Sequence, residues 1–510
     1  MSASIKVGVA SSTQLSADAG RDMIAEGGNA VDVAVAAALV AIATEPGVCS
    51  VGGGGYITVW PAGGKPVTLD GNIEMPGRGL DPERLGGGAW DVVLDYGGGV
   101  TTKVGHGSVG TPGALAALEL AATRYGSLPW DVLMAPVVEI TRRGFPMSKA
   151  SYTYLQFAHK LVYGWQAESY NALHDEHGEL YKIGELLRVE KLSDSLEHIA
   201  REGTRDLYAG DIAKLIAADF ERHDGVMTAR DLAEYEVISR EPLITDFGPW
   251  RLATNPAPAV GGATLSAMLT LLEQHPMNGW DSASVARLAQ IQANVLRYRF
   301  DQLDLADDPL AAVSELMAHA GRGSVPTRNG SGATVNTSAA DRDGLACTIT
   351  MSAGYGAGVM PPGTGLWMNN CLGEIELNRR GLIAGPTGTR LSSNMAPTVG
   401  RTRAGDVLAI GSPGADRITS ALVQTLVNHV QLGLPLNEAI EQPRLHVELL
   451  EQGEQVAYER GIDVADIRMP LRECDPLSMF FGGVGAVSVD PGGGFQIGAD
   501  ARRLGGTAAG

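Results

Sequence analysis

The chain has 510 residues, more than one small core needs, which implies two domains or one large layered domain. Its 39 basic and 58 acidic side chains give a net charge of −19, and so acidic a surface repels phosphate backbones and excludes nucleic acid as an expected partner. The four cysteines are scattered without disulfide or metal-ligand spacing. We therefore expect four free, mostly buried thiols and no bound metal.

The first segment, Met1 to Lys6, lacks the basic and then apolar regions of a signal peptide. The most apolar run, residues 31–43, contains Asp32 and is shorter than the roughly 20 residues that cross a bilayer. We expect this run to be a buried helix. The sequence therefore predicts a cytoplasmic protein without membrane contacts.

Alanine-rich helices are expected first, followed by a pair of strands. Asn29 is a suitable N-cap for the second helix, which Pro46 ends. Residues after the glycine-rich elbow alternate between apolar and polar, as in a half-buried strand. The ranges are 16–45 for the two helices, 51–55 for the elbow, and 56–60 and 67–70 for the strands.

Helices dominate the middle of the chain, with two short strands among them. The expected helices cover 113–125, 129–143, parts of 185–201, two segments of 208–237 on either side of 223–225, 261–272 and 284–304. The expected strands lie near 242–245 and 251–254.

Strands dominate after a Gly/Ser/Pro/Asn-rich linker over residues 321–333, which its composition makes accessible to cleavage. A helix-rich part and a strand-rich part joined in this way indicate layered α/β packing. The expected strands are 334–340, 345–352, 366–369, 407–411, 484–489 and 495–498, with one long helix over 418–431.

A β-hairpin beginning at Thr334 carries the most informative chemistry. Its turn, residues 341–344, fits a three-residue loop closed by glycine, a register that sets Thr334 opposite Ser352. Partners in this position have Cβ atoms about 4.5–5.5 Å apart. If the chain is cut before Thr334, the new α-amine can act as a base for the threonine hydroxyl, and Ser352 could orient either group. The same residues would also suit an ordinary edge hairpin.

A second candidate element is the turn Gly411-Ser412-Pro413-Gly414-Ala415-Asp416-Arg417, which follows a strand and precedes a helix. Its small residues allow close approach of a ligand, and its N–H groups could hold an oxyanion. A plain strand-to-helix turn would look the same. The glycines at 354–358 lead to prolines and not to a helix, so no dinucleotide fingerprint is present and no cofactor is expected.

These pieces resemble the γ-glutamyltranspeptidase family of N-terminal nucleophile hydrolases nearly from end to end. The matching segments are 26–32, 52–56, 109–113, 225–228 with 231–232, 256–262, 391–393 and 411–417. The resemblance implies an α/β fold in which four layers form an αββα sandwich. It also implies a precursor that cleaves itself between Ala333 and Thr334, giving a large fragment, 1–333, and a small one, 334–510, intertwined in one fold.

The same resemblance assigns roles to individual residues. Thr334 would attack a substrate carbonyl and form an acyl-enzyme that water or an amine releases. The backbone N–H groups of Gly414 and Ala415 would form the oxyanion hole, although the family usually has glycine at the second position. Ser392 and Ser393 match the serine pair that contacts substrate.

Departures from the family pattern concern the groups that grip a γ-glutamyl substrate. The nucleophile motif, usually Thr-Thr-His-x-Ser, has Asn336 at its third position. The arginine expected near residues 70–74 is missing, and Arg78 is out of register. The usual aspartate falls at Gly373, beside Glu374, which with Asn336 becomes a candidate substrate contact. Losing a bidentate arginine is not conservative, so we expect a non-standard small-molecule substrate.

Three hypotheses follow. The first is an autoprocessing threonine hydrolase or acyltransferase whose partners are its substrate and its own two fragments, with an oligomer possible. The second is a biosynthetic homologue that cleaves a carbon–carbon bond beside a carbonyl. The third is an unprocessed, non-catalytic protein that binds a small ligand, since fold alone does not prove function.

Overall fold

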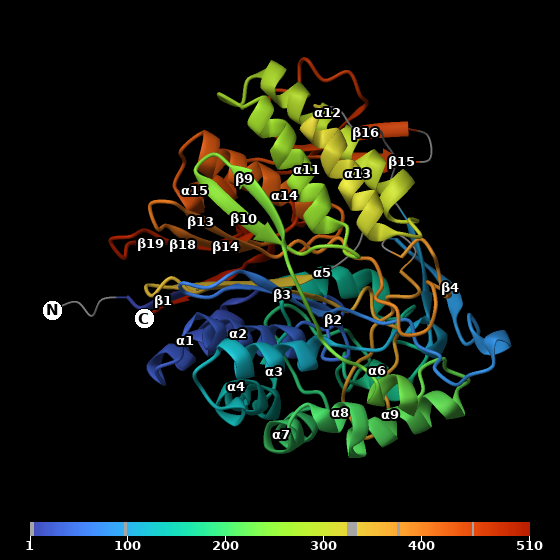
Figure 1. Ribbon diagram of the computed structural model, residues 1–510. Coiled ribbons are helices and arrows are strands. Elements are labelled where there is room, and N and C mark those ends of the chain that lie inside the picture. Colours follow the sequence, from blue (N-terminus) through green and yellow to red (C-terminus); the bar gives the residue numbers. More distant parts are fainter. Residues whose placement is uncertain (1–4, 96–98, 324–333, 375–377, 451–452) are drawn as a thin grey trace.

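Two β-sheets stacked face to face form the centre of the molecule, and helices cover both outer faces (Figure 1). The computed structural model describes residues 5–95, 99–323, 334–374, 378–450 and 453–510. The layers are helices, sheet, sheet and helices, which is the expected αββα sandwich.

The first sheet is antiparallel throughout and has β11 and β12 at its centre. Both strands of the hairpin therefore have a neighbour on each side. The strand order is β20 (Gly506–Ala509), β1 (Val7–Ser11), β11 (Val335–Asp341), β12 (Ala346–Ser352), β2 (Gly54–Trp60), β3 (Val67–Gly71) and β8 (Ile238–Arg240).

The second sheet packs β14 and β18 against β11 of the first. Small side chains fill the layer between the sheets, including Ala10, Ala340, Ala346 and Ala409. This close approach explains why both sheets are rich in alanine, serine and threonine here. The strand order is β19 (Phe495–Ala499), β18 (Gly485–Val489), β14 (Val407–Gly411), β13 (Thr398–Thr402), β10 (Trp250–Thr254) and β9 (Leu243–Phe247).

Helices α1, α2 and α3 pack on the outer face of the first sheet, and α4 packs on α2 from outside (Figure 1). The expected N-cap is confirmed, because the Asn29 side chain accepts hydrogen bonds from the N–H groups of Val31 and Asp32. Every residue of α2 is buried, since it lies between the sheet and α4. The bounds are α1 (Gln14–Ala25), α2 (Ala30–Thr44), α3 (Ala114–Tyr125) and α4 (Trp130–Arg143).

The second sheet carries its own helical layer (Figure 1). These helices are α11 (Gly261–Gln274), α12 (Ser282–Tyr298), α13 (Pro309–Gly321), α14 (Arg417–Leu426) and α15 (Leu436–Glu441). The remaining elements are α5 (Lys149–Ala158), α6 (Ala167–Asn171), α7 (Leu192–Glu202), α8 (Arg205–Ala209), α9 (Asp211–Arg222), α10 (Ala229–Ala233), β4 (Trp90–Leu94), β5 (Val100–Val104), β6 (Phe145–Pro146), β7 (Leu186–Leu187), β15 (Leu445–Leu450), β16 (Gly453–Glu459) and β17 (Leu471–Cys474).

Two expected elements are wrong. Residues 366–369 are not a strand, because only Met368 pairs, in an isolated bridge with Gly52. The helix expected from residue 185 begins only at Leu192, since Leu186 and Leu187 pair with β6 instead.

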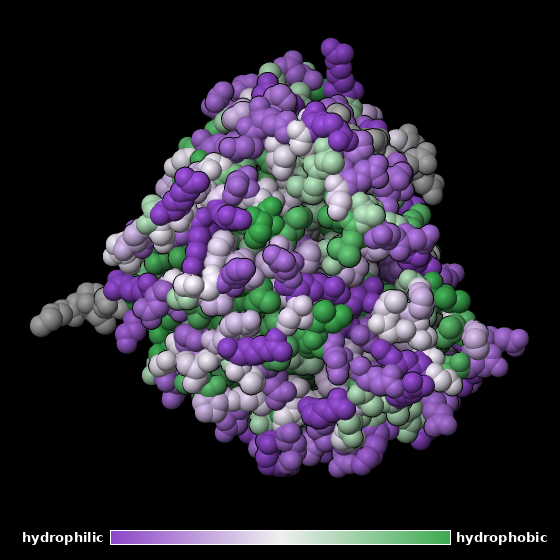
Figure 2. All heavy atoms as spheres, in the orientation of Figure 1, coloured by the Kyte–Doolittle hydropathy of each residue, from purple (hydrophilic) through white to green (hydrophobic). Residues whose placement is uncertain are grey.

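Outside the sandwich, the surface is mixed. Figure 2 shows hydrophilic residues over most of one face, with hydrophobic ones gathered near its middle.

Within the described ranges, none of the helices combines the length and apolar character needed to span a bilayer. All four cysteines are free, Cys49 and Cys347 fully buried and Cys371 and Cys474 partly exposed.

Candidate active site

Thr334 lies directly before β11 and is 1% exposed. The hairpin has the register that its turn predicts, with Val335 opposite Met351 and Ala340 opposite Ala346. One further step sets Thr334 opposite Ser352. An ordinary edge hairpin is excluded, because β11 pairs with β1 on its other side. Ala333, the other half of the expected cleavage site, lies outside the described residues.

Residues distant in sequence hold the start of β11. Arg503 Nη1 donates to the carbonyl oxygen of Thr334 at 3.5 Å. The Ser12 hydroxyl donates to the Asn336 carbonyl at 3.3 Å and accepts from the Asn336 N–H at 3.2 Å. The backbone on both sides of Val335 is therefore fixed by the N-terminal and C-terminal ends of the chain.

A buried carboxyl, Glu45, belongs to the same neighbourhood. It occupies the C-cap position of α2 and accepts a hydrogen bond from Ser148 Oγ at 3.1 Å. Burial raises its pKa to about 7, and Ser148, Arg503 and Ser12 oppose that rise. Glu45 was not a sequence candidate, because nothing along the chain shows that the end of α2 approaches Arg503.

The turn between β14 and α14 presents two unused amides. Gly414 has φ 126° and Ala415 has φ 55°, and Ala415 is fully buried. Within the described parts of the chain, neither residue's N–H donates a hydrogen bond. Ser412 is engaged inside the turn, where its hydroxyl donates to the Pro413 carbonyl and accepts from the Gly483 N–H. It is therefore not placed as a nucleophile.

The turn lies against the hairpin through two contacts. A Cβ on Gly411 would be 2.0 Å from Asn336 Oδ1, so only glycine allows β14 this close to β11. The second contact is indirect: Gly483, whose N–H donates to Ser412 of the turn, lies so close to Arg503 that an added Cβ would be 2.7 Å from Arg503 Cδ, and Arg503 in turn donates to Thr334.

Buried charges fix the far side of the turn. Arg299 Nη1 lies 2.6 Å from Asp416 Oδ1 and the same guanidinium pairs with Asp304 at 3.2 Å. The Asn394 side chain also donates to Asp416. This network connects the turn to the segment that carries the predicted serine pair.

The two predicted serines face different surroundings. Ser392 lines a cavity of about 480 Å³, and its Oγ has no hydrogen-bond partner among the described residues. Ser393 Oγ accepts from the Met395 N–H at 3.2 Å, so this hydroxyl supports the local backbone. Of the two hydroxyls, only that of Ser392 is without a partner in the described chain, and this oxygen is itself buried.

The other predicted contacts lie away from that cavity. Asn336 is 2% exposed, and in either amide orientation its side chain bonds Ser338 and Thr350. Glu374 is also 2% exposed, and a Cβ on Gly354 would lie 2.8 Å from its Oε2. Ser352 Oγ accepts from the Gly354 N–H at 3.1 Å. The structure thus brings Ser352 and Glu374 to the same loop, beyond the end of β12.

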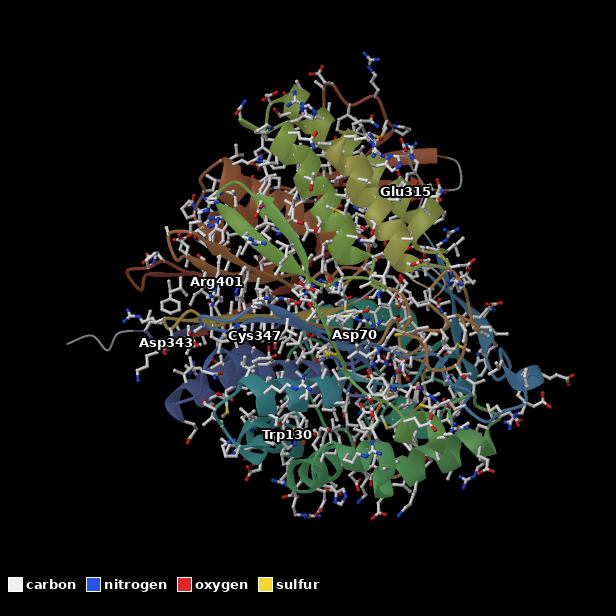
Figure 3. The ribbon with its side chains drawn as sticks, viewed as in Figure 1. Asp70, Trp130, Glu315, Asp343, Cys347 and Arg401 are labelled. Atoms are coloured by element: carbon white, nitrogen blue, oxygen red, sulfur yellow. The ribbon has the colours of Figure 1, made fainter. Side chains whose placement is uncertain are left out.

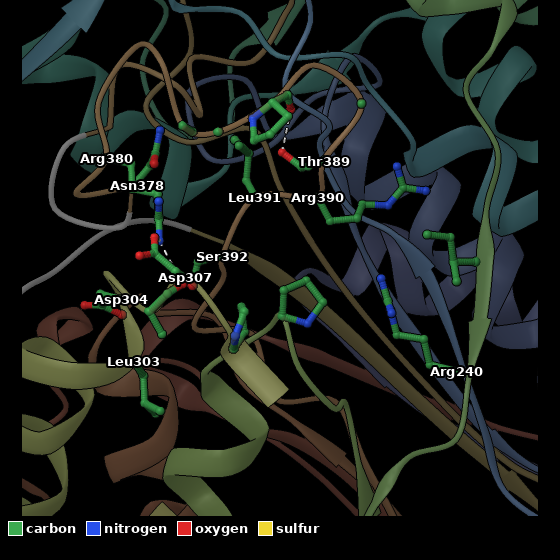
Figure 4. Close-up of a pocket in the computed structure, with 18 residues that line it drawn as sticks. Arg240, Leu303, Asp304, Asp307, Asn378, Arg380, Thr389, Arg390, Leu391 and Ser392 are labelled. Atoms are coloured by element: carbon green, nitrogen blue, oxygen red, sulfur yellow. Dashed lines mark hydrogen bonds and ion pairs between the residues drawn. The ribbon is translucent and has the colours of Figure 1, made fainter. Parts of the chain in front are cut away.

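Three arginines line the cavity, with Arg240 and Arg390 on one side and Arg380 on the other (Figure 4). Arg240, Arg380 and Arg390 line it together with apolar residues such as Leu303 and Leu391. Sequence reasoning missed these arginines. Its one available signal was that Arg390 directly precedes Leu391 and Ser392.

Carboxylates occupy the place where the resemblance expects a lone arginine. Asp70 pairs with Arg240 at 2.7 Å and with Arg390 Nε at 3.2 Å. Glu74 pairs with Arg390 and, at 3.0 Å, with Arg78. Figure 3 labels Asp70 at the end of the first sheet opposite the hairpin tip, which Asp343 marks. Arg240 and Arg390 are therefore largely neutralised by protein groups.

The family model described as Gamma-glutamyltranspeptidase matches residues 16–510. The chain belongs to this family. It is thus a γ-glutamyltransferase- or hydrolase-like enzyme of the N-terminal nucleophile hydrolase type. Glutathione hydrolase proenzyme from Pseudomonas aeruginosa is 30% identical over 478 residues, covering 87% of this chain and 83% of the relative. The Escherichia coli protein of the same name is 28% identical over 503 residues, covering 90% and 84%.

A solved structure supports the fold. Cephalosporin acylase from Bacillus halodurans superposes with a TM-score of 0.80 at 24% identity, covering 99% of this chain and 96% of that one. The word proenzyme in the relatives' names points to a chain that is processed into fragments.

Proposed function

We propose that Thr334 is the nucleophile of an autoprocessing amide hydrolase or acyltransferase. One observation carries the proposal: a buried threonine leads the central strand β11, and a turn with two unused amides packs against that strand. Membership of the family supports the chemistry.

Self-cleavage would proceed through an ester. The Thr334 hydroxyl attacks the Ala333 carbonyl carbon, its proton passes to the departing Thr334 nitrogen, and the C–N bond breaks. Water then hydrolyses the ester. The products are fragments 1–333 and 334–510, with a free α-amine on Thr334. Because β11 and β12 lie between β1 and β2, both fragments would remain in one fold.

Turnover would use the same hydroxyl. The α-amine, with a pKa near ~8 in ordinary peptides, accepts its proton as the oxygen attacks the substrate carbonyl. The amides of Gly414 and Ala415 stabilise the oxyanion. The leaving amine takes the proton, and water or a second amine releases the acyl group from Thr334.

We propose a substrate other than a standard γ-glutamyl compound. The arginines near the expected carboxylate grip are paired with Asp70 and Glu74, which leaves little free positive charge for an amino-acid head group. The cavity beside Ser392 combines apolar walls with a hydroxyl that has no partner among the described side chains. These features suit an acyl group with an apolar body and one polar end. A cytoplasmic location stays a prediction.

Intact-mass spectrometry of the purified protein tests the nucleophile. We expect two fragments, one beginning at Thr334, and a single uncut chain for Thr334→Ala. A single chain in both proteins would contradict self-processing and favour the ligand-binding alternative. If processing occurs, a screen of amide substrates that differ only in acyl group then tests the substrate class, with γ-glutamyl amides as the reference.

A further inference from the structure

Two histidines and an aspartate converge at the end of α9, in a cluster that the proposed reaction does not use. His106 Nε2 lies 2.9 Å from Asp219 Oδ2, and His223 Nδ1 lies 3.2 Å from Asp219 Oδ1. One donor atom from each of the three residues lies within 4.8 Å of the other two. No other group of three such residues with this geometry occurs among the residues that the structure describes.

A simple His–Asp hydrogen bond explains only part of this arrangement. It satisfies His106 and one oxygen of Asp219, but the other oxygen, Oδ1, is buried without a hydrogen-bond partner in the described chain. The nearby His223 Nδ1 is directed instead to the Asp219 carbonyl, at 2.9 Å. A buried carboxylate oxygen without a partner is costly, and it faces a second imidazole.

The surroundings suit a bound cation. His106 and Asp219 are 3% and 2% exposed, and the rings of Phe220 and Trp165 pack edge-on against His106. His223, which stacks on His106, is 46% exposed and gives the cluster an opening to solvent. Apolar walls on one side and a solvent path on the other are typical of a metal site that keeps a water ligand.

We propose that His106, Asp219 and His223 bind a divalent transition-metal cation of the zinc class. Two imidazole nitrogens and one carboxylate oxygen are ligands that zinc prefers, and water would complete a tetrahedron. Magnesium and calcium are less suited, because they take oxygen ligands. Binding requires His106 Nε2 to be the unprotonated nitrogen and His223 Nδ1 to exchange its carbonyl partner for the metal.

The site would be structural, because its backbone connections lead to the loops that support the candidate site. His106 opens the short turn His106–Ser108, whose Ser108 carbonyl accepts from the Leu372 N–H at 3.1 Å. Three residues later, Thr111 exchanges backbone hydrogen bonds with Glu74. A cation would therefore link α9 to both Glu74 and the segment before Glu374.

Calorimetric titration of the chelator-treated, full-length protein with zinc chloride tests the proposal. We expect one zinc ion per chain and a melting temperature that rises with zinc concentration. His223→Ala, at a half-exposed position, should fold normally and weaken zinc binding by roughly tenfold or more. With cobalt as the probe, we expect visible absorption bands that His223→Ala abolishes.

Two controls make the result specific. His177 is 78% exposed and outside the cluster, so His177→Ala should bind zinc as the unchanged protein does. His159 and His174 form another close pair, with Nδ1 and Nε2 2.7 Å apart, and His159→Ala tests whether zinc binds there instead. No binding, or binding that His223→Ala leaves unchanged, would overturn the proposal. Neither outcome depends on whether Thr334 is the nucleophile.

Discussion

Arg503, seven residues before the C-terminal Gly510, donates to the backbone carbonyl of Thr334, at the start of the central strand. Its stem lies against Gly483, next to the turn that carries Gly414 and Ala415. One side chain therefore connects the expected nucleophile to the expected oxyanion hole. Its positive charge also faces the buried Glu45.

Arg503→Met should slow self-processing about tenfold, because it removes a charged donor worth about 1.5 kcal/mol while keeping the apolar stem. The measurement is the rate of fragment appearance by intact mass. Arg143→Met, at an exposed position on α4, is the matched control and should process normally. An unchanged rate in Arg503→Met would show that this contact does not position Thr334.

Ala415→Gly should stabilise the protein while leaving turnover within about twofold. Ala415 has φ 55°, a left-handed conformation that costs a residue with a Cβ about 1 kcal/mol, partly offset by the greater freedom of glycine in the unfolded chain. We expect the free energy of unfolding to rise by about 0.5 kcal/mol. Because the backbone N–H is retained, a large loss of turnover would mean that the methyl group itself contacts substrate.

Gly414→Ala should have the opposite effect. Gly414 has φ 126°, and an added Cβ would lie 2.8 Å from Gly482 Cα. Both strain and clash would shift the turn, so we expect a lower melting temperature and at least a tenfold loss of turnover. Ala415→Gly removes one methyl group from the turn, and Gly414→Ala adds one. Opposite effects of these two variants would therefore reflect the backbone geometry at each position and not the presence of a methyl group as such.

Local sequence predicted the parts of the fold that local chemistry determines. Asn29 caps α2 because its side chain reaches amides two and three residues on. The hairpin register follows from a turn that Gly344 closes with φ 91°. By contrast, the strands β1 and β20 pair across nearly the whole chain, and nothing in their short apolar runs specifies such distant partners.

The candidate site could be predicted only where it lies on one motif. Thr334 and the Gly414–Ala415 turn each lie in a single recognisable segment. No recognisable motif contains Arg390, Arg503 or Glu45, because each acquires its role from a partner more than a hundred residues away. Asn336 shows the converse: its sequence position suggested a substrate contact, whereas its side chain packs between the sheets.

Ser392→Ala and Ser393→Ala should separate substrate binding from stability. Ser392 lines the cavity and its buried Oγ has no partner in the described protein, so its loss should lower kcat/KM without changing the melting temperature. Ser393 Oγ accepts the Met395 N–H, and its loss should destabilise the fold by about 1 kcal/mol. Equal effects on stability would contradict the assignment of Ser392 to the cavity.

Glu45 should make the protein less stable as pH rises through neutrality. Burial raises its pKa from 4.5 to about 7, so the folded state holds this proton more tightly than the unfolded chain does. The resulting stabilisation is fully present below pH 4.5 and is lost as pH rises through about 7. Glu45→Gln, which cannot ionise, should remove this dependence.

Melting and denaturant unfolding at pH 5 and pH 8 would measure the effect, on chains that also carry Thr334→Ala so that every sample is one uncut polypeptide. Between these pH values, the chain with Glu45 should lose about 2–3 kcal/mol relative to Glu45→Gln. Glu26→Gln, the same change at an exposed position, is the control and should leave the pH dependence intact. If Glu45→Gln and Glu26→Gln behave alike, Glu45 is ionised in the folded protein throughout this range, and Arg503 stabilises its charge more strongly than burial opposes it.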